Sequence, residues 1–412
     1  MKLPHSSREN SLDASRAVRL GLCVVAMLAL GCSHGNDAIS VTKPPATAAK
    51  KLPRRLAPSR GRAFYISSTG SNSNPGTKAR PWRSVQKALS VLLPGQVAYV
   101  RAGTYAQSLV MSRAGSAVAP ITVRNYPGER PVLRPGGSGS MDYPVRITKG
   151  AAYFRLQGFV IEGAPLHSTV NVWVSDGQQT SLPAPTHHIE LSNNEIRNGT
   201  GSSVLVSPNT DSVQLLGNLV HDSGDGSTQH QGIYFQGQNG LIANNVVYRT
   251  PNGFGIQLRG NYPDPDTVVE MPVRNVIVAN NTVVGSSLSG IVVENTGTDI
   301  TVVNNISAYN GSYGIRGYYN GSGAILPGNR AFNNLAYGNG GQYGNTSGTI
   351  IDFSGGNLIA DPLFQNQAGN DYRLQTSSPA LDKALADYTP SSDYSDTARP
   401  QGTGPDLGAH ER

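Results

Sequence analysis

The stretch Asn244-Asn245-Val246-Val247 is one copy of a pattern that returns down the middle of the chain. Counted from Asn194, the second residue of the pattern recurs after 24, 27, 36, 24 and 29 residues. A period of roughly 20–30 residues with irregular loops is typical of a solenoid. The units are rich in Val, Ile, Gly and Asn, so they favour short strands and turns over helices. The other copies begin at Asn193, Gly217, Asn280, Asn304 and Asn333.

Each unit carries two stretches of alternating apolar residues. The first stretch ends at the repeated Asn, and the second begins with Gly and a branched residue, as in Gly232-Ile233. Alternate residues of a strand point to the same face. We therefore predict two strands per turn, stacked coil on coil into parallel sheets around an elongated core. The inward residues are expected to be Ile189, Leu191, Val213, Leu215, Ile233, Phe235, Ile256, Leu258, Val276, Val278, Ile291, Val293, Ile300 and Val302.

The repeated Asn comes where a strand becomes a turn, a place where Asn tolerates left-handed backbone angles and bonds to nearby backbone groups. Equivalent residues of stacked strands lie about 4.8 Å apart, so their amides can hydrogen-bond along the stack. Because the phase holds over six units, we favour a continuous ladder over independent Asn turns. Its predicted members are Asn194, Asn218, Asn245, Asn281, Asn305 and Asn334.

Segments on both sides of the repeats carry a further likeness. They are Phe64–Thr77, Arg80–Leu89, Val97–Tyr105, Ala360–Phe364, Tyr372–Leu374, Ser378–Asp382 and Gly404–Glu411. Together with the repeats, these segments resemble the secreted bacterial right-handed parallel β-helix proteins, the group that contains pectate lyases and related polysaccharide lyases, epimerases and hydrolases. The resemblance covers residues 62–412 and implies an all-β fold, a single-stranded right-handed parallel β-helix. It selects no chemistry, because this fold hosts several, and the Asp-Pro-His motif of alginate epimerases and the Trp-Ile-Asp-His motif of pectate lyases are absent.

Residues 1–31 are predicted to be a signal peptide of the lipoprotein type. Arg16 and Arg19 precede an eleven-residue apolar run, which is too short to span a membrane comfortably. The run ends in Leu-Ala-Leu-Gly-Cys32, which resembles a bacterial lipoprotein cleavage box and would make Cys32 the lipidation site. Since Ala29 stands where Leu is usual, an ordinary secretory signal is the alternative. We expect an exported protein, anchored to a membrane at the cell surface or in the periplasm, with no disulfide because Cys23 would be removed.

Residues 32–61 are rich in Pro, Ala and Lys and have no apolar period, so we predict a disordered linker. Residues 62–412 are expected to form one β-helix domain with repeats from about 145 to 340. A helix over about Ser84–Leu93 is predicted to close the N-terminal end, because a solenoid must cover its last apolar layer. The loop-rich stretch from about 357 to 412 is predicted to cap the C-terminal coils.

The charge pattern indicates which class of molecule the chain binds. The formal net charge is +7, but charged residues make up only 14% of the chain, and many of the basic ones fall in the linker. The basic character therefore does not indicate a nucleic-acid groove. We expect a monomer that binds an acidic polysaccharide and reaches the membrane only through its lipid anchor.

Outward positions on the second strand of each unit are expected to stack into two strips. Function must lie on such a face and in its loops, because inward positions are used for packing. Aromatic rings can stack on sugars, while Arg and Gln can bind carboxylates or hydroxyls. The strips are Trp173, Leu205, Tyr234, Gln257, Val292 and Arg316, and then Ser175, Ser207, Gln236, Arg259, Glu294 and Tyr318. The predicted substrate-binding residues are Trp173, Gln236, Gln257, Glu294, Arg316 and Tyr318, and the alternative is that they are merely solvated or covered by loops.

The loop that ends at His230 is the best candidate for catalysis. β-Elimination of a uronate polymer needs a positive group beside the sugar carboxylate, a base for the α-proton and an acid for the leaving oxygen. We assign these roles to Arg259 or a Ca²⁺ ion, to His230 and to Tyr234. Asp222 and Asp225 would orient His230 or bind a cation. The alternative is that the His and Asp residues of this loop only form turns and caps.

A hydrolase would instead need two carboxylates across a groove, one of them protonated. Asp222, Asp225 and Glu294 are candidates, although Glu294 is expected to pair with Arg259. We favour a polysaccharide lyase, with a non-catalytic glycan-binding or surface structural protein as the alternative and a hydrolase as the third possibility.

A metal site has weaker support. Asp264 and Asp266 offer oxygen ligands that suit Ca²⁺, although their spacing does not match a calcium loop. His187-His188 is not a zinc pair, because adjacent strand residues point to opposite faces and no further Cys or His follows at ligand spacing. Ca²⁺ therefore remains the possible cofactor, and no other is expected.

Overall fold

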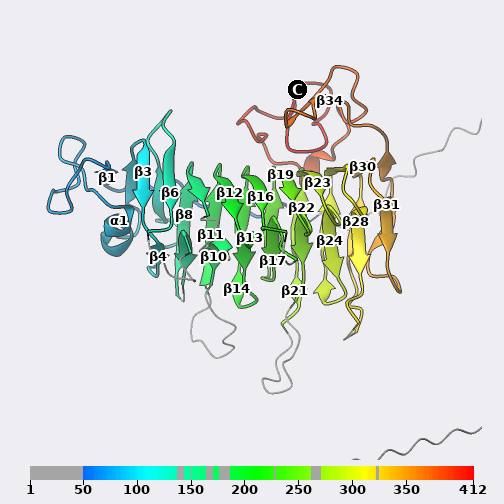
Figure 1. Ribbon diagram of the computed structural model, residues 1–412, viewed down its shortest axis with the longest axis horizontal. Coiled ribbons are helices and arrows are strands. Elements are labelled where there is room, and N and C mark those ends of the chain that lie inside the picture. The colour runs from blue at the N-terminus through cyan, green and yellow to red at the C-terminus, as the bar shows by residue number, and fades with distance from the viewer. Residues whose placement is uncertain are drawn as a thin grey trace, which may run out of the picture. The chain divides into compact units, whose positions relative to one another are not determined.

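The chain winds into successive coils of parallel strands (Figure 1). The computed structural model describes residues 50–136, 143–148, 150–163, 170–175, 186–226, 229–260, 271–321 and 324–412. The predicted signal peptide, Cys32, Asp264 and Asp266 lie outside these residues. Among the described residues, no helix has the length and apolar character needed to cross a membrane.

Three parallel sheets form the walls of the β-helix, and each coil passes through sheet A, then sheet B, then sheet C. Sheet A consists of β1 (Ala63–Ile66), β2 (Val97–Val100), β5 (Ile121–Asn125), β8 (Ala152–Gln157), β11 (Thr186–Ser192), β15 (Gln214–Leu216), β18 (Leu241–Ala243), β22 (Ile277–Ala279), β26 (Thr301–Val303), β29 (Arg330–Phe332) and β32 (Asp352–Gly355), with β14 (Thr210–Asp211) beside β11. Sheet B consists of β3 (Gly103–Ala106), β6 (Pro131–Arg134), β9 (Val160–Glu162), β12 (Glu195–Gly199), β16 (Leu219–Ser223), β19 (Val246–Thr250), β23 (Thr282–Ser286), β27 (Ile306–Ala308), β30 (Leu335–Tyr337) and β33 (Leu358–Ile359). Sheet C consists of β4 (Leu109–Met111), β7 (Val145–Ile147), β10 (Val170–Val174), β13 (Ser202–Val206), β17 (Ile233–Phe235), β20 (Ile256–Leu258), β24 (Ile291–Glu294), β28 (Tyr313–Tyr318) and β31 (Gly341–Asn345).

The prediction of two strands per turn is wrong, because each coil has three. The turn from sheet A to sheet B takes only two residues, such as Gly217-Asn218 between β15 and β16. The strand that the sequence did not predict is the one after the repeated Asn, such as β16, because the Asn indicated the start of a turn. The coils also extend beyond the expected repeats at 145–340, since sheet A already pairs β1 with β2 and sheet B continues to β33. The predicted all-β parallel β-helix and its inward residues are confirmed, and those residues join one core cluster.

The repeated asparagines lie in a column inside the turn between sheets A and B. The first residue of each pair has left-handed backbone angles, with φ of +57° at Asn244 and +52° at Asn280. The second residue is buried, and its side-chain oxygen accepts bonds from the coil before it. The Nδ2 of Asn245 donates to Oδ1 of Asn281 at 2.9 Å, and Nδ2 of Asn281 donates to Oδ1 of Asn305 at 2.9 Å. The ladder runs through Asn194, Asn218, Asn245, Asn281, Asn305, Asn334 and Asn357.

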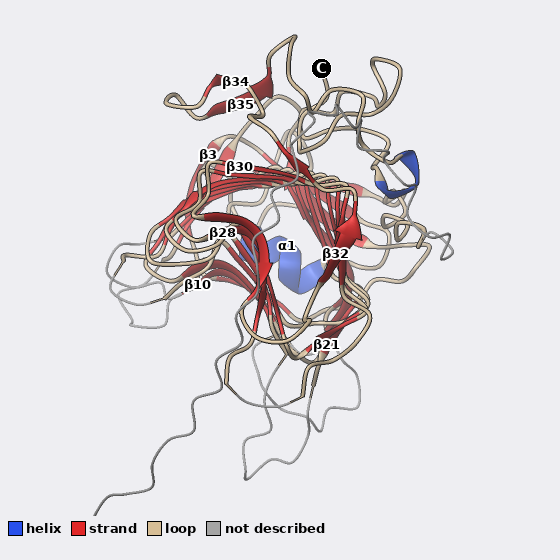
Figure 2. Ribbon diagram, turned by 90° about the vertical axis from the view of Figure 1, so that its right-hand side faces the viewer, coloured by secondary structure: helices blue, strands red, loops and turns tan. Residues whose placement is uncertain are grey.

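A helix closes the N-terminal end, as predicted. Helix α1 (Val85–Val91) begins after Ser84, whose side chain accepts a hydrogen bond from the Lys87 N–H at 3.2 Å. Val85, Ala88 and Leu89 are buried and belong to the core of the barrel. In the view along the barrel axis, α1 lies within the outline of the three sheets (Figure 2).

Residues 50–61, called the strap here, differ from the free linker that the sequence predicts. The strap is extended but bound to the outer face of sheet A. Arg55 pairs with buried Glu190 at 2.5 Å, and Arg155 donates to the backbone oxygen of Leu56 at 2.6 Å. Leu52 packs against apolar outward residues of sheet A. A polar and Pro-rich composition therefore did not make this segment free, because an ion pair, a hydrogen bond to its backbone and an apolar contact hold it.

The C-terminal cap, residues 360–412, covers the side of the barrel. It contains the antiparallel pair β34 (Phe364–Asn366) and β35 (Asp371–Leu374) and a short 3₁₀ helix, η1 (Ala386–Tyr388). Its apolar residues pack on outward residues of later strands in sheet B (Figures 1 and 2). These contacts join Phe364, Tyr372, Leu374, Leu407 and Ala409 to Val246, Tyr248, Val284, Ile306 and Leu335.

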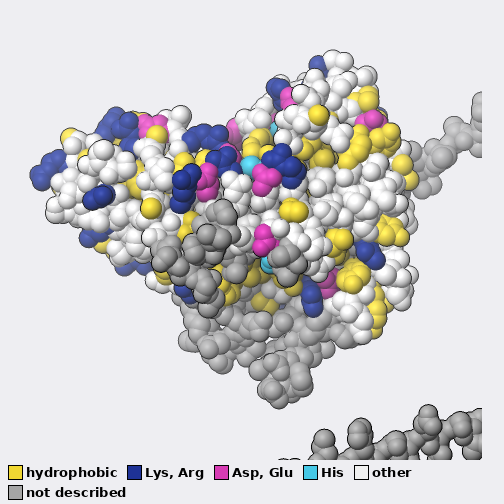
Figure 3. All heavy atoms as spheres, viewed as in Figure 1, with side chains coloured by type: hydrophobic (Ala, Val, Ile, Leu, Met, Phe, Trp, Pro, Cys, Tyr) yellow, Lys and Arg dark blue, Asp and Glu magenta, His cyan; other side chains and the backbone are white. Residues whose placement is uncertain are grey.

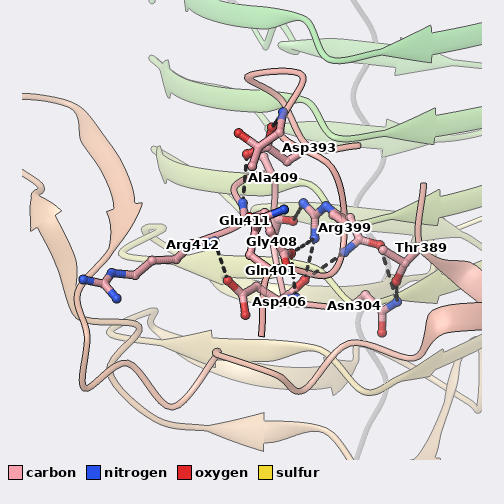
Figure 4. A network of polar contacts seen from close by, with 12 residues as sticks. Asn304, Thr389, Asp393, Arg399, Gln401, Asp406, Gly408, Ala409, Glu411 and Arg412 are labelled. Carbon is pink, nitrogen blue, oxygen red and sulfur yellow. Dashed lines mark hydrogen bonds and ion pairs between the residues drawn. The ribbon is translucent and has the colours of Figure 1, made fainter. Parts of the chain in front are cut away.

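A buried polar network holds the cap in shape (Figure 4). Arg399 donates to the backbone oxygens of Asp406 and Gly408 at 2.7 and 2.8 Å and pairs with Glu411 at 3.3 Å. Glu411 accepts from the backbone N–H groups of Gln401 and Asp406. The side chains of Arg399 and Glu411 are 1% and 0% exposed. The motif near residues 404–411 therefore has a structural role.

Arg399→Met is expected to destabilise the fold by about 3–5 kcal/mol, because it leaves the buried Glu411 carboxylate without its opposite charge and removes a hydrogen bond from two backbone oxygens. Urea unfolding measures the loss. The matched control is Arg373→Met, which removes the exposed pair with Asp371 and should leave the midpoint unchanged. Equal effects of both variants would show that the Arg399 pair does not stabilise the cap.

Candidate functional site

The outer face of sheet C is the face that the strap and the cap leave uncovered. The strap and residues of η1 pack on sheet A, and the rest of the cap packs on sheet B. In the described part of the chain, neither segment contacts the outward residues of sheet C. Long connections leave this sheet, for example between β10 and β11 and between β20 and β21 (Val273–Arg274), which pairs with β25 (Gly297–Thr298). Sheet C is therefore where a polymer can reach outward side chains.

The two predicted strips exist in the predicted register. Trp173 pairs with Leu205, Leu205 with Tyr234, Tyr234 with Gln257, Gln257 with Val292 and Val292 with Arg316. In the second strip Glu294 pairs with Tyr318, as expected from its place after Val293. The strips differ in exposure along their length. Half-buried members are Trp173, Tyr234, Gln236, Arg259, Arg316 and Tyr318, whereas Gln257 and Glu294 are buried.

A carboxylate and a guanidinium meet in the middle of this face. Glu294 accepts hydrogen bonds from Gln257 and, at 2.7 Å, from Asn320, and it pairs with Arg259 at 3.3 Å. Its side chain is 1% exposed, while that of Arg259 is 38% exposed. Burial raises the pKa of Glu294, and the charge of Arg259 acts against this rise. The arrangement anchors Arg259 from beneath and leaves part of its guanidinium toward the outer face.

Two more predicted residues lie beside this centre. The hydroxyl of Tyr234 accepts from Nε2 of Gln236 at 3.3 Å, and Gln236 lies one coil before Arg259. His230 lies at the turn that leads into β17, close to Gly224: a Cβ added to Gly224 would be 3.0 Å from the His230 Cβ. His230 is therefore at the rim of sheet C, before the strip that carries Tyr234.

Aromatic side chains lie on both sides of the centre. Towards the N-terminal coils, Trp173 packs edge-on against Tyr143 at 5.1 Å, and its indole N–H donates to Ser207 at 2.9 Å. Towards the C-terminal coils, the guanidinium of Arg316 lies 4.8 Å from the ring of Tyr318. The sequence analysis missed Tyr143 and Asn320, which lie outside its strips. A search for polar residues just beyond each strand would have found them.

Asp222 and Asp225 do not belong to this face. Asp222 is at the end of β16 in sheet B, with φ of +54°, and it pairs with Arg249 through two bonds of 2.7 Å. The bond from Arg249 lowers the pKa of Asp222. Asp225 lines a hollow of about 650 Å³ with Glu162 and Asp222. Asp222 lies in sheet B, but Gly224, between the two carboxylates in the sequence, lies close to His230, so their role in orienting His230 stays a prediction.

Sheet B carries a charged network that the sequence analysis missed. Arg197 pairs with both Glu162 and Glu195, and Glu195 also pairs with Arg130 and, at 3.5 Å, with His221. In Figure 3, charged side chains of both signs gather between the N-terminal coils and the cap. The alternating Glu195-Ile196-Arg197 was its sequence signal. This network occupies the outer face of sheet B where the cap ends.

Glu195 should make stability depend on pH. The hydrogen bond from His221, together with the charges of Arg130 and Arg197, lowers the pKa of Glu195 to about 2. A carboxyl with a lowered pKa stabilises the fold above its unfolded pKa, and this contribution is lost as the pH falls toward 2. Glu195→Gln should therefore cost about 1–2 kcal/mol at pH 7, after allowance for solvent screening. In urea unfolding, the difference from the parent chain should shrink below about pH 4.5; a difference that is constant with pH would contradict this role.

The structure offers little on metal binding. The described residues contain no group of three or more His, Cys, Asp and Glu side chains that could hold a metal ion. Asp264 and Asp266 lie outside the described residues. The prediction that His187 and His188 point to opposite faces is wrong, because His188 has φ of +52° and the two Nδ1 atoms lie 2.9 Å apart.

Comparison with known proteins supports the fold. Residues 64–238 match the family model described as Pel9A-like, right handed beta helix region, and residues 184–357 match the model described as right handed beta helix region. The crystal structure of pectate lyase Pel9A is similar with a TM-score of 0.56 and 15% identity, over 85% of this chain and 96% of that one. The right-handed parallel β-helix fold that the sequence predicts is confirmed.

Two curated relatives match short parts of the chain. "Pectate lyase PEL9" from Emericella nidulans is 33% identical over 72 residues, which are 17% of this chain and 18% of the relative. "Uncharacterized protein YwoF" from Bacillus subtilis (strain 168) is 27% identical over 143 residues, 33% of this chain and 29% of the relative. The match spans less than a third of the length of either relative.

Proposed function

Since the chain is a right-handed parallel β-helix protein with an outer face left uncovered on sheet C, we propose that it acts on a polysaccharide, as a lyase that cleaves a uronate-containing polymer by β-elimination. The observation that carries the proposal is Arg259, held by buried Glu294 in the middle of that face. Trp173 and Tyr318 on either side would bind neighbouring sugars. The names of PEL9 and Pel9A, which are pectate lyases, agree with this substrate class.

The elimination needs a base, an acid and a positive group beside the sugar carboxylate. A base removes the proton from the carbon next to the sugar carboxylate, the electron pair forms the new C=C bond, and the glycosidic C–O bond on the following carbon breaks. The leaving oxygen takes a proton. Arg259 would stabilise the carboxylate as it gains enolate character. Tyr234 would protonate the leaving oxygen, and His230 at the rim is the proposed base.

The distribution of carboxylates favours a lyase over a hydrolase. Hydrolysis needs two carboxyl groups that face each other across the bond to be cleaved. On the described parts of the two strips, Glu294 is the one carboxylate, and Asp222 faces outward from sheet B. Glu294 is too deeply buried to reach a sugar, so we give it the role of positioning Arg259.

The test is cleavage of a panel of pectins, alginates and glycosaminoglycans. A lyase product carries a C=C bond conjugated with the carboxylate, which absorbs ultraviolet light. Absorbance should rise with at least one uronate polymer, measured with added Ca²⁺ and with a chelator. New reducing ends without absorbance would indicate a hydrolase, and retained binding without any cleavage would indicate a glycan-binding protein.

We also propose that the protein is exported and anchored by lipid at Cys32. The support is the sequence around that residue. Labelling of the full chain with a radioactive fatty acid in a bacterial host should be lost in Cys32→Ala. Labelling that persists in this variant would show that Cys32 is not the anchor.

A further inference from the structure

The N-terminal part of the barrel is strongly basic. Residues 50–136 contain fifteen Lys and Arg and a single acidic residue, Glu129, whereas residues 137–412 contain thirteen basic and twenty-two acidic residues. The structure places most of this charge on the first coils as well as on the strap, and dark blue patches mark this end of the molecule in Figure 3. The exposed basic residues outside the strap are Arg62, Lys78, Arg80, Arg83, Arg101, Arg130 and Arg134.

Three tyrosines form a cluster on the outer face of sheet A at this end. Tyr65 of β1 pairs in register with Tyr99 of β2, and their rings stack with centroids 5.8 Å apart. The ring of Tyr126, just after β5, lies 6.4 Å from Tyr65 and 6.2 Å from Tyr99. All three side chains are half-buried. We call Tyr65, Tyr99 and Tyr126 the tyrosine cluster.

Basic side chains surround the tyrosine cluster. Lys78 and Arg101 lie 5.4 and 4.9 Å from the centre of the Tyr126 ring. A hydrogen bond with Tyr126 raises the pKa of Lys78, which keeps the ammonium group charged. Arg124 pairs in register with Tyr99, and its Nε–H lies buried without an acceptor. The one nearby acid, Glu129, is already neutralised by Arg101 at 2.7 Å.

The tyrosine cluster is open to a ligand. The strap covers the neighbouring outward position of sheet A, where Ser59 bonds to Thr122, two residues before Arg124, at 2.7 Å, and Gly61 bonds to Gly95. Within the described part of the chain, the hydroxyls of Tyr65 and Tyr99 make no hydrogen bond. The cluster thus combines aromatic faces and unused hydroxyl groups with Lys78, Arg124 and the part of Arg101 that Glu129 does not bind.

We propose that the tyrosine cluster, with Lys78, Arg101 and Arg124, is a second binding site for an anionic polysaccharide. Sugar rings would stack on the tyrosines, and carboxylate or sulfate groups would pair with the cations. The excess positive charge of residues 50–136 complements such a polymer and repels a cationic one. The site lies on sheet A, so it binds without cleaving and does not depend on the activity proposed for sheet C.

The test is binding of the full chain to polygalacturonate, chondroitin sulfate and neutral galactan in affinity gels, with Arg259→Ala present throughout so that no polymer is cleaved. The site variant is Tyr65→Ala/Tyr99→Ala, and Lys78→Glu is a second variant at a fully exposed position that should not disturb folding. Both should weaken binding to at least one anionic polymer about tenfold or more. Each stacking or cation contact that is lost accounts for a large share of this decrease in affinity. The matched control is Arg83→Ala/Lys87→Ala, which removes two charges from the same end but away from the cluster.

The control distinguishes a specific binding site at the tyrosine cluster from the general positive electrostatic field of the N-terminal coils. Weaker binding in the cluster variants, with the control near the parent, supports the proposal. It is overturned if the control loses as much affinity as the variants, if galactan binds equally well, or if the variants bind like the parent. Binding only to anionic lipid vesicles would also overturn it, because that would identify a membrane surface instead. Cleavage in a chain with intact Arg259 is measured separately, so failure of the lyase proposal leaves this result readable.

Discussion

Arg259→Ala should lower kcat/KM on the uronate polymer that the chain cleaves by a factor of about 10²–10³, because a positive group fixed beside a developing enolate is worth that much in other enzymes. The guanidinium is partly exposed on the outer face of sheet C, and Glu294, which accepts hydrogen bonds from Gln257 and Asn320, fixes it from beneath. It cannot be replaced by a mobile charge without loss, so Arg259→Lys should recover only part of the rate. The measurement is the initial rise in ultraviolet absorbance, per folded protein.

A purely structural role of Arg259 would give a different result from a catalytic one. Without the guanidinium, Glu294 remains hydrogen-bonded to Asn320 and can take up a proton, so the fold should persist. Arg274→Ala is the control: this exposed arginine on β21 bonds to Gln238 and should leave kcat/KM unchanged. If Arg259→Ala lowers the melting temperature but leaves the rate of the folded enzyme intact, Arg259 only supports the sheet and the proposed mechanism is wrong.

The phase of the repeats was enough to predict the barrel, its inward residues and the register of the two strips. Stacked coils place equivalent residues side by side. An alignment of the repeat units in the sequence therefore also identifies which residues are neighbours in space. The number of strands per coil was not predictable in this way. The repeated Asn indicated the end of a strand, so the short strand that follows it after a two-residue turn, such as β16, was not predicted.

Exposure could not be predicted from the repeats either. Gln257 and Glu294 have outward positions, yet both are buried, and the burial turns Glu294 from a substrate contact into a support for Arg259. Asp222 was expected in a loop, but it lies within β16 of sheet B, with left-handed backbone angles that the repeat pattern did not predict. The strap was missed because its contacts with Glu190 and Arg155 join residues more than 90 positions apart. Such contacts leave no local pattern.

Asn281→Ala should lower the free energy of unfolding by about 4 kcal/mol, since one substitution leaves several buried groups without partners and each costs about 1–3 kcal/mol. The side-chain oxygen of Asn281 accepts from the backbone N–H and Nδ2 of Asn245, both at 2.9 Å, and its Nδ2 donates to the backbone oxygen of Ile242 at 2.8 Å and to Asn305 at 2.9 Å. The residue is fully buried, so water cannot replace these bonds. Urea unfolding measures the loss, and Gln367→Ala in the exposed turn between β34 and β35 is the control that should change little.

A double-mutant cycle separates a ladder from a row of independent turns. Asn245 and Asn281 lie in successive coils and share two hydrogen bonds, so Asn245→Ala/Asn281→Ala should cost less than the sum of the single variants, by about 1–2 kcal/mol. Asn194 and Asn305 are separated along the stack and share no bond, so their losses should add. If the neighbouring pair is also additive, each asparagine stabilises only its own turn, and the coils are held by the core and the backbone bonds alone. Non-additivity confined to neighbouring asparagines would instead mean that their amide hydrogen bonds couple the stability of adjacent coils. Each Asn side chain bonds to the turn of the coil before it.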